Sequence, residues 1–106
     1  MSYAYLIIYE GKPEAPDLFL NYYVKQHLPI VWTFPKIRRV EVDRGVAGED
    51  FFMMARLTFD TLEDLRAALQ SPERERARAD MANFPPFQGQ VRRYTVEILK
   101  IPPEQS

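Results

Sequence analysis

Cysteine is absent from this 106-residue sequence, and histidine occurs once. Without cysteine there is no disulfide framework, no thiolate nucleophile and no thiolate ligand for a metal ion. A single histidine adds too few ligands for a structural zinc or iron–sulfur site. The sequence therefore predicts chemistry that needs no metal cofactor.

Glycine is scarce, with four residues in the chain, and none has the spacing of a phosphate-binding loop. A nucleotide cofactor is therefore not expected. Serine is scarce too, since Ser2 and Ser71 are the serines that precede the final residue. Ser71 precedes Pro72 and is predicted to cap a helix, so a Ser-His-Asp triad is hard to build.

Long apolar runs are missing, because no stretch approaches the ~20 residues that cross a bilayer. Residues 3–9 carry neither a basic lead-in nor a small-residue cleavage site, so we expect a cytoplasmic protein with no membrane partner. The 14 basic and 15 acidic residues nearly cancel, and a nucleic-acid partner is not expected. The length suits one domain spanning residues 1–106.

Hydrophobic periodicity and capping signals predict the order strand, helix, strand, strand, helix pair, strand. The strands, rich in β-branched and aromatic residues, are expected at about 3–9, 36–44, 51–59 and 91–101. The helices, opened by proline or capping residues, are expected at about 16–28, 61–70 and 72–83. This is the βαββαβ pattern of a ferredoxin-like α+β fold with a four-stranded antiparallel sheet.

The predicted strands 3–9 and 51–59 carry apolar side chains for both faces of the sheet. In a ferredoxin-like fold all helices pack on one face, and a strand that is apolar on both sides is normally covered on both. We therefore expect a homodimer formed through the sheet faces.

The stretch 22–35 is where the chemistry is expected, because it holds the single histidine and the single tryptophan. His27 is the side chain whose ordinary pKa lies nearest neutrality. Pro29 is expected to stop the helix after Leu28, which would place His27 at a helix end beside a cavity. Two roles stay open: a general base or acid on a bound organic substrate, or a structural histidine that donates to a backbone carbonyl and fixes the turn.

Several short motifs, in this order and spacing, resemble the EthD family of the dimeric α+β barrel superfamily. They are Tyr22-Tyr23, His27-Leu28-Pro29, Arg38-Arg39-Val40-Glu41-Val42, Phe59-Asp60-Thr61 with Leu65, Ser71-Pro72-Glu73 and Asp80-Met81-Ala82-Asn83-Phe84. The resemblance implies a homodimer whose paired sheets enclose a barrel-like interior, with a pocket in each subunit between sheet and helices. Related dimeric barrels include polyketide cyclases, dehydratases, cofactor-free quinone monooxygenases and haem-degrading enzymes, so the fold alone does not define the reaction.

Asp80 is the candidate partner that orients His27 or binds a substrate hydroxyl, and its alternative role is a surface ion pair with Arg76. Arg56 interrupts an apolar strand, so it either pairs with Glu41 or Glu97 or binds an acidic ligand group. Aromatic rings would line an apolar ligand pocket or simply form the core. These rings are Tyr22, Tyr23, Trp32 and Phe84, with Tyr5 and Tyr9 from the first strand. Arg74, Arg76 and Arg78 alternate with acidic residues and are expected to form a solvated helix face.

The leading functional interpretation is an enzyme without a metal or nucleotide cofactor. His27 would assist proton transfer on a hydrophobic, aromatic or carbonyl-bearing small molecule, as in a lyase, dehydratase or cyclase. One alternative is a cofactor-free quinol monooxygenase, in which oxygen attacks an activated carbanion inside an apolar pocket. Another is a non-catalytic ligand-binding or accessory dimer with a structural His27.

Overall fold

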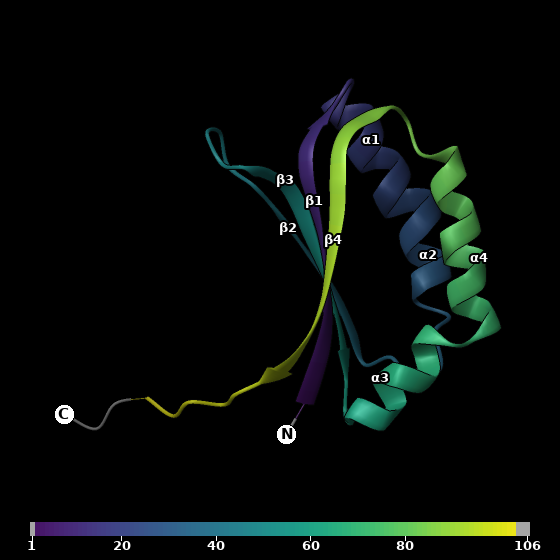
Figure 1. The fold of residues 1–106 in the computed structure, drawn as a ribbon, viewed down its shortest axis with the longest axis vertical. Helices are drawn as coiled ribbons and strands as arrows, with labels where there is room; N and C mark the ends of the chain where they lie inside the picture. The colour runs from purple at the N-terminus through teal and green to yellow at the C-terminus, as the bar shows by residue number, and fades with distance from the viewer. Residues whose placement is uncertain (1, 104–106) are drawn as a thin grey trace.

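The computed structural model describes residues 2–103. A four-stranded antiparallel sheet has the strand order β2-β3-β1-β4 and carries the helices on one face (Figure 1). The strands are β1 (Ser2–Pro13), β2 (Arg39–Arg44), β3 (Phe51–Phe59) and β4 (Phe87–Ile98). The helical segments are α1 (Pro16–Tyr22), the π-helical η1 (Tyr23–His27), α2 (Leu28–Val31), α3 (Leu62–Leu69), α4 (Pro72–Asp80) and the 3₁₀ turn η2 (Met81–Asn83). The predicted ferredoxin-like α+β fold is confirmed, and no helix in residues 2–103 is long and apolar enough to span a bilayer.

Strands β1 and β4 are 12 residues long, so β1 runs well beyond its predicted end and β4 begins earlier than expected. They pair throughout, and Gly11 lies opposite Gly89 in the register. The φ angles of these glycines are 127° and 150°. A Cβ atom at Gly11 would clash with the carbonyl oxygen of Gln88, and one at Gly89 would clash with that of Glu10. Only glycine fits this close approach, so the two glycines allow the pairing to continue beyond the predicted strand ends.

The first helical region does not stop at Leu28 as predicted. It widens into the π turn η1, where the backbone N–H of Leu28 donates to the carbonyl of Tyr23. The α-helical pattern then resumes in α2, with the N–H of Trp32 donating to Leu28 at 2.9 Å. Pro29 lies in the first turn of α2, where its missing N–H removes no helical hydrogen bond. The π turn keeps His27 on the buried side of a continuing helix, an arrangement that is frequent at functional sites.

Strand β2 starts at Arg39, three residues later than expected. Lys36, three residues before the strand, has a φ of 60°, a left-handed conformation that belongs to a turn and not to a strand. The chain therefore leaves α2 through a turn before it enters the sheet.

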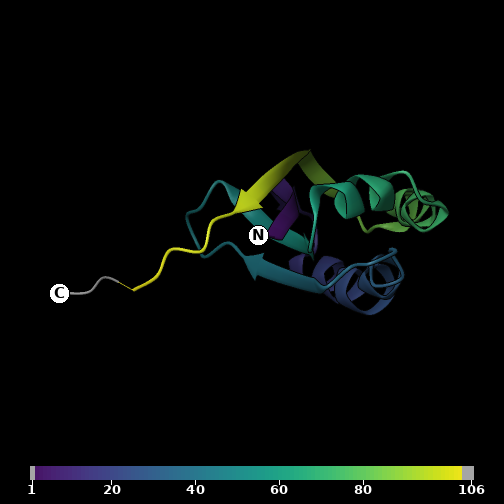
Figure 2. The ribbon, with the colours of Figure 1, turned by 90° about the horizontal axis from the view of Figure 1, so that it is seen from below.

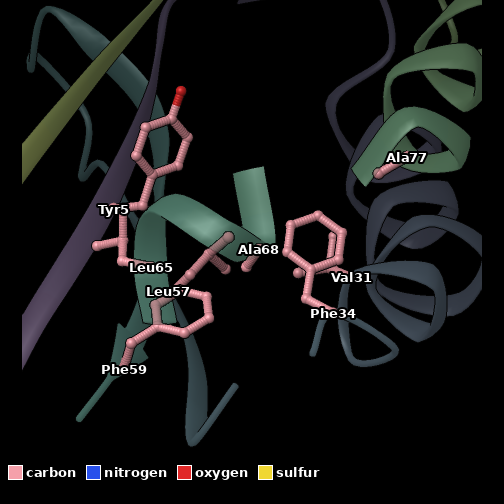
Figure 3. Packing of buried hydrophobic residues seen from close by; sticks show 8 residues of the cluster. All are labelled: Tyr5, Val31, Phe34, Leu57, Phe59, Leu65, Ala68 and Ala77. Carbon is pink, nitrogen blue, oxygen red and sulfur yellow. The ribbon is translucent and has the colours of Figure 1, made fainter. Parts of the chain in front are cut away.

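Two buried clusters fill the layer between sheet and helices. The first combines residues of β1, β3 and the helices, drawn in Figure 3: Tyr5, Val31, Phe34, Leu57, Phe59, Leu65, Ala68 and Ala77. The second lies toward the other end of the sheet and contains Tyr9, Phe19, Tyr23, Met53 and Ala55. Among the described residues, His27 is the buried polar side chain, 5% exposed. The fold therefore places its one histidine inside an otherwise apolar layer.

The other face of the sheet carries no helix (Figures 1 and 2). Leu6 and Ile8 point to this face, because they alternate with Tyr5 and Tyr9, which are buried under the helices. Arg56 pairs in register with Leu6 and therefore lies on the uncovered face too.

Candidate functional site

Asp80, at the end of α4, accepts hydrogen bonds from three side chains. The hydroxyl of Tyr22 donates to Oδ1 at 2.7 Å, and the amide of Asn83 donates to the same oxygen at 3.1 Å. Nδ1 of His27 lies 2.9 Å from Oδ2. The predicted alternative partner of Asp80, Arg76, instead lies 3.9 Å from Glu73. The structure thus joins His27 and Asp80, which are 53 residues apart in sequence, into one polar group.

The charge states of this pair follow from burial and hydrogen bonding. The side chains of His27 and Asp80 are 6% and 11% exposed. Burial lowers the pKa of His27 below its ordinary value, although the adjacent Asp80 carboxylate partly opposes this. Burial raises the pKa of Asp80, but the hydrogen bonds from Tyr22, His27 and Asn83 together outweigh it and hold that pKa below its usual range. At neutral pH the pair is therefore a neutral imidazole beside a carboxylate.

The tautomer of His27 is assigned from this contact. A carboxylate only accepts hydrogen bonds, so the proton of the neutral ring must be on Nδ1. Nε2 then carries a lone pair. Nε2 makes no hydrogen bond with residues 2–103. Every fully buried side-chain nitrogen or oxygen in this range has a hydrogen-bond partner, so the unpaired Nε2 cannot be fully buried. Nε2 is therefore accessible from a space beside the ring.

Aromatic rings hold the imidazole in place. The ring of Tyr23 lies 5.1 Å from that of His27, and Phe84 meets it edge-on at 4.7 Å with an interplanar angle of 87°. Tyr9 packs against Tyr23 at 5.5 Å. Burial raises the pKa of Tyr9 to about 12 and that of Tyr23 well above its ordinary value. Both phenols remain protonated at neutral pH and can donate hydrogen bonds.

His27 forms part of the wall of a cavity between the sheet and the helices. The remaining wall is mostly apolar or basic: Tyr5, Ile7, Tyr9, Val31, Phe34, Leu57, Leu69, Arg74, Ala77, Arg78, Met81 and Arg93. The empty space between these walls is about 410 Å³ when the open mouth is included. The part of it in which the centre of a water molecule fits is about 40 Å³. This is more than the ~10–15 Å³ that one water needs. Because Nδ1 is held by Asp80, Nε2 is the ring nitrogen available to a molecule in this cavity.

The residues predicted for the site fall into two groups. Tyr22, Tyr23 and Phe84 surround the His27–Asp80 pair, as the contacts above describe. Trp32 does not join them, since it is 50% exposed. Among the described residues, none of these four aromatic side chains lines the cavity, whereas Tyr5 and Tyr9 do. Arg56 lies on the opposite face of the sheet, directly across from Glu41, whereas Glu97 points to the helix-covered face. A pairing of Arg56 with Glu97 within one subunit is therefore wrong, because the sheet separates the two side chains.

Sequence reasoning missed the basic part of the cavity wall. Arg74, Arg76 and Arg78 were interpreted as one solvated face, but Arg74 and Arg78 line the cavity while Arg76 points away toward Glu73. Residues four apart share a helix face and residues two apart do not, so the sequence spacing already indicated that Arg74 and Arg78 lie together and that Arg76 lies apart from them. Arg93 joins them because it pairs in register with Ile7, on the helix-covered face of the sheet.

No group of three or more His, Asp or Glu side chains within residues 2–103 is arranged to ligate a metal ion. The chemistry that the described site offers is that of an imidazole–carboxylate pair, protonated phenols and guanidinium groups.

Comparison with known proteins relates the chain to one family. The model of the EthD domain matches residues 12–88. An uncharacterized 11.0 kDa protein from the thcB-thcC intergenic region of Rhodococcus erythropolis is 30% identical over 86 residues, which are 77% of this chain and 82% of that protein.

Solved structures share the fold at lower identity. An EthD family protein from Bacillus halodurans has a TM-score of 0.81 at 23% identity and covers 93% of this chain and 100% of its own. SnoaB, a cofactor-independent oxygenase from Streptomyces nogalater, has a TM-score of 0.70 at 14% identity, with 97% and 98% covered. A dimeric protein of unknown function with a ferredoxin-like fold from Bacteroides fragilis has a TM-score of 0.67 at 16% identity, with 92% and 96% covered.

Proposed function

The chain belongs to the EthD family, and for this member we propose that His27 is a general base acting on a hydrophobic, carbonyl-bearing small molecule in the cavity. One observation carries the proposal. The Nδ1 atom of His27 is held 2.9 Å from the Asp80 carboxylate, which leaves the Nε2 lone pair for the cavity that this ring lines. A structural histidine would be expected to use both ring nitrogens within the protein.

The proposed step is the removal of a proton from the carbon beside a carbonyl group. The C–H bond breaks, its proton moves to Nε2, and its electron pair passes into the carbonyl to give an enolate oxygen. Asp80 stabilises the imidazolium that forms, and such proton transfer contributes about 10²–10⁴-fold to a rate. The imidazolium can return the proton to a leaving hydroxyl or to another carbon, which are the proton movements of a dehydratase, a lyase or a cyclase.

The phenol of Tyr9 is a suitable donor to the developing oxyanion. Tyr9 lines the same cavity, and burial raises its pKa to about 12. It therefore keeps its proton at neutral pH and offers a preorganised hydrogen bond where negative charge develops. Tyr23 supports it from behind, with the ring planes of the two tyrosines at 80°.

The apolar walls favour a ring-bearing ligand. Ile7, Val31, Phe34 and Leu57 form the inner surface. The space that water can occupy is far smaller than the ~300–1,000 Å³ of typical ligand pockets. Because water centres can occupy only about 40 Å³ of the cavity, the ligand must displace side chains at the mouth. Arg78 and Arg93 are cavity residues that are also exposed, so they mark this mouth.

The test is proton exchange at the carbon beside the ketone of acetophenone or 2-tetralone in D₂O, followed by NMR. The wild-type protein should accelerate exchange, His27→Ala should abolish the acceleration, and Arg76→Gln should leave it intact because Arg76 lies outside the cavity. Circular dichroism must show all three proteins folded. Equal exchange rates with wild type and His27→Ala would overturn the proposed role of His27.

A cofactor-free oxygenase is a second candidate, supported by the shared fold with the Streptomyces protein described above. His27 would take a proton from a quinol hydroxyl, the resulting carbanion would add O₂ to give a hydroperoxide, and loss of water would leave a quinone that carries one new oxygen atom. Oxygen uptake in the presence of 1,4-dihydroxynaphthalene distinguishes the two, because the lyase, dehydratase and cyclase reactions consume none. A protein that exchanges ketone protons without oxygen uptake supports the leading proposal, and one that binds these probes without either reaction supports the accessory role.

We also propose that the protein acts as a homodimer through the uncovered sheet face. Leu6, Ile8 and Met54 lie on this face, which carries no helix, and the Bacteroides protein of the same fold is dimeric. A second copy would remove these apolar side chains from water. Sedimentation equilibrium should give twice the 12.5 kDa chain mass, and Ile8→Lys should give the single-chain mass. A monomeric wild-type protein would refute this arrangement.

A further inference from the structure

We propose that the ligand of this cavity is an acid: an apolar, ring-bearing carboxylate whose anionic group is bound by Arg74, Arg78 and Arg93. This inference rests on the proposed function, because it defines the substrate class of the same cavity. It adds a second anchoring point, so that the carbonyl end of the ligand meets His27 and the anionic end meets the guanidinium groups.

The charges of the cavity wall are all of one sign. Three arginines belong to the wall, and none of the described residues that form it is an aspartate or a glutamate. Asp80, the carboxylate bound to His27, is not one of the wall residues and is already engaged by three donors. A mostly apolar cavity with uncompensated positive charge attracts an anion and raises its local concentration.

Among residues 2–103, the three guanidinium groups have no carboxylate within 4.0 Å, whereas Arg38 pairs with Asp60 and Arg92 with Glu10. Arg74 donates from Nη1 to the carbonyl of Leu69 at 3.1 Å. This contact holds the Arg74 side chain against the end of α3, and the other N–H donors of its guanidinium group remain free to bind a ligand.

The positions of the arginines suit one shared anion. Arg74 and Arg78 are one helical turn apart on α4 and both line the cavity. Arg93 belongs to β4, on the sheet side of the same cavity, and its Nη2 lies 3.6 Å from Sδ of Met81 at the end of α4. Sulfur is a weak acceptor that a carboxylate oxygen would readily replace. A guanidinium group also binds a carboxylate through two parallel hydrogen bonds, which fixes the orientation of the ligand.

The arrangement gives the ligand a direction. Tyr9 pairs with Val91 on β4, two residues from Arg93, and the charge of Arg93 lowers the pKa of Tyr9 and Tyr23 against the larger effect of burial. An acid held by the arginines would therefore lie beside the Tyr9 phenol, in the cavity that His27 also lines. The same positive charge would favour the enolate that proton removal creates.

The experiment compares 3-benzoylpropionate, which carries a ring, a ketone and a carboxylate, with its neutral amide. Dissociation constants come from calorimetry, and the ring protons of His27, the single histidine, report binding at the site by NMR. We expect the acid to bind about tenfold or more tightly than the amide at low salt. Arg78→Gln or Arg93→Gln should reduce this preference about three- to tenfold each, since both arginines are partly solvated.

Arg76→Gln is the matched control. Arg76 lies on the same helix with the same charge but faces Glu73, outside the cavity. It should leave the preference for the acid unchanged, whereas the triple substitution at positions 74, 78 and 93 should abolish it. If Arg76→Gln weakens acid binding as much as Arg78→Gln does, the effect is one of net charge and the proposed site is wrong.

The outcomes separate this inference from the function it rests on. If acid and amide bind equally and both shift the His27 signals, the acid class is refuted while the cavity and the proposed role of His27 stand. If the acid binds with the predicted preference but His27→Ala retains proton exchange on it, the acid class stands and the proposed function fails. If neither probe moves the His27 signals at millimolar concentration, both proposals are overturned.

Discussion

Replacing Asp80 by asparagine should reverse the tautomer of His27 while leaving the shape of the site almost unchanged. In the wild type the carboxylate accepts from Tyr22 and Asn83 at Oδ1 and from His27 at Oδ2. The asparagine oxygen will face the two donors Tyr22 and Asn83, which turns its NH₂ group toward Nδ1 of His27. Nδ1 must then accept, so the ring proton moves to Nε2 and the lone pair leaves the cavity.

The magnitudes follow from what the substitution removes. Loss of the correct tautomer should lower proton-transfer activity by about 10²–10⁴-fold, with little change in ligand affinity. The Asp80 carboxylate raises the pKa of His27 against the effect of burial, so Asp80→Asn should lower this pKa further, by about 1 pKa unit or more. The exchange of a charged hydrogen bond for a neutral one should cost about 1–2 kcal/mol of unfolding free energy.

The assay is a pH titration of the His27 ring signals, followed by urea unfolding of the same samples. The chain has a single histidine, so the signals need no assignment. A pKa of His27 that stays the same or rises in Asp80→Asn would refute the reasoning, because it would show that the carboxylate does not interact with the ring. Asp64→Asn, which alters a carboxylate near the exposed Lys36, controls for the loss of one negative charge and should leave the His27 pKa unchanged.

Three further predictions concern pH, the Asp80 network and the β1–β4 pairing. The pKa of His27 is lower in the folded chain than its ordinary value of about 6.5. Below about pH 6.5 the unfolded chain therefore binds more protons at His27 than the folded chain does, and the free energy of unfolding should fall as the pH drops. Urea unfolding across this range should show that slope in wild type and not in His27→Phe; the same slope in both would assign it elsewhere. Tyr22→Phe removes a hydrogen bond that holds the pKa of Asp80 down, so a carboxyl NMR titration should show a higher Asp80 pKa in this variant. The control Tyr94→Phe should leave the Asp80 pKa unchanged. An unchanged Asp80 pKa in Tyr22→Phe would contradict the contact between Tyr22 and Asp80. Gly89→Ala should destabilise the fold by about 2 kcal/mol or more, because the new Cβ atom would clash with the backbone of Glu10. In the control variant Gly48→Ala the new Cβ atom has no other atom within 4 Å, so the substitution should cost about 1 kcal/mol. Equal thermal stability of the two variants would contradict the close approach of β1 and β4.

The order of elements could be predicted from the sequence because local signals agree with the tertiary fold. Proline and serine mark the start of α4, where Ser71 caps the helix through its hydroxyl at 3.2 Å from the N–H of Arg74. Thr61 does the same for α3. These signals depend on neighbours within a few residues, which a linear reading captures.

The ends of β1 and β4 could not be predicted in this way. Gly11 and Gly89 are breakers when each is considered alone, but together they let two backbones approach. The π turn before Pro29 was missed for a related reason, since the packing of Tyr23 against Tyr9 of the sheet and the contact of His27 with Asp80 support a widened turn that local propensity disfavours.

His27 could be proposed as a candidate from the sequence because it is the single histidine in the chain. His27 stands alone in composition, and the spacing of the family motif suggested Asp80 as its partner. The faces of the arginines were not predicted, because the charges of α4 alternate in sequence and only the packed helix separates Arg74 and Arg78 from Arg76. For Arg56 an ion pair with Glu41 or Glu97 and binding of an acidic ligand group both stayed open, because a strand that is apolar on both faces leaves the direction of the side chain undetermined.

The most direct test of the account is the protonation state of the two His27 ring nitrogens, measured by ¹⁵N NMR on the wild-type protein above its His27 pKa. We predict a protonated Nδ1, bonded to Asp80, and an unprotonated Nε2 whose signal changes when a ligand enters the cavity. A proton on Nε2, or an Nε2 signal that no cavity ligand affects, would contradict the proposal that His27 is a base.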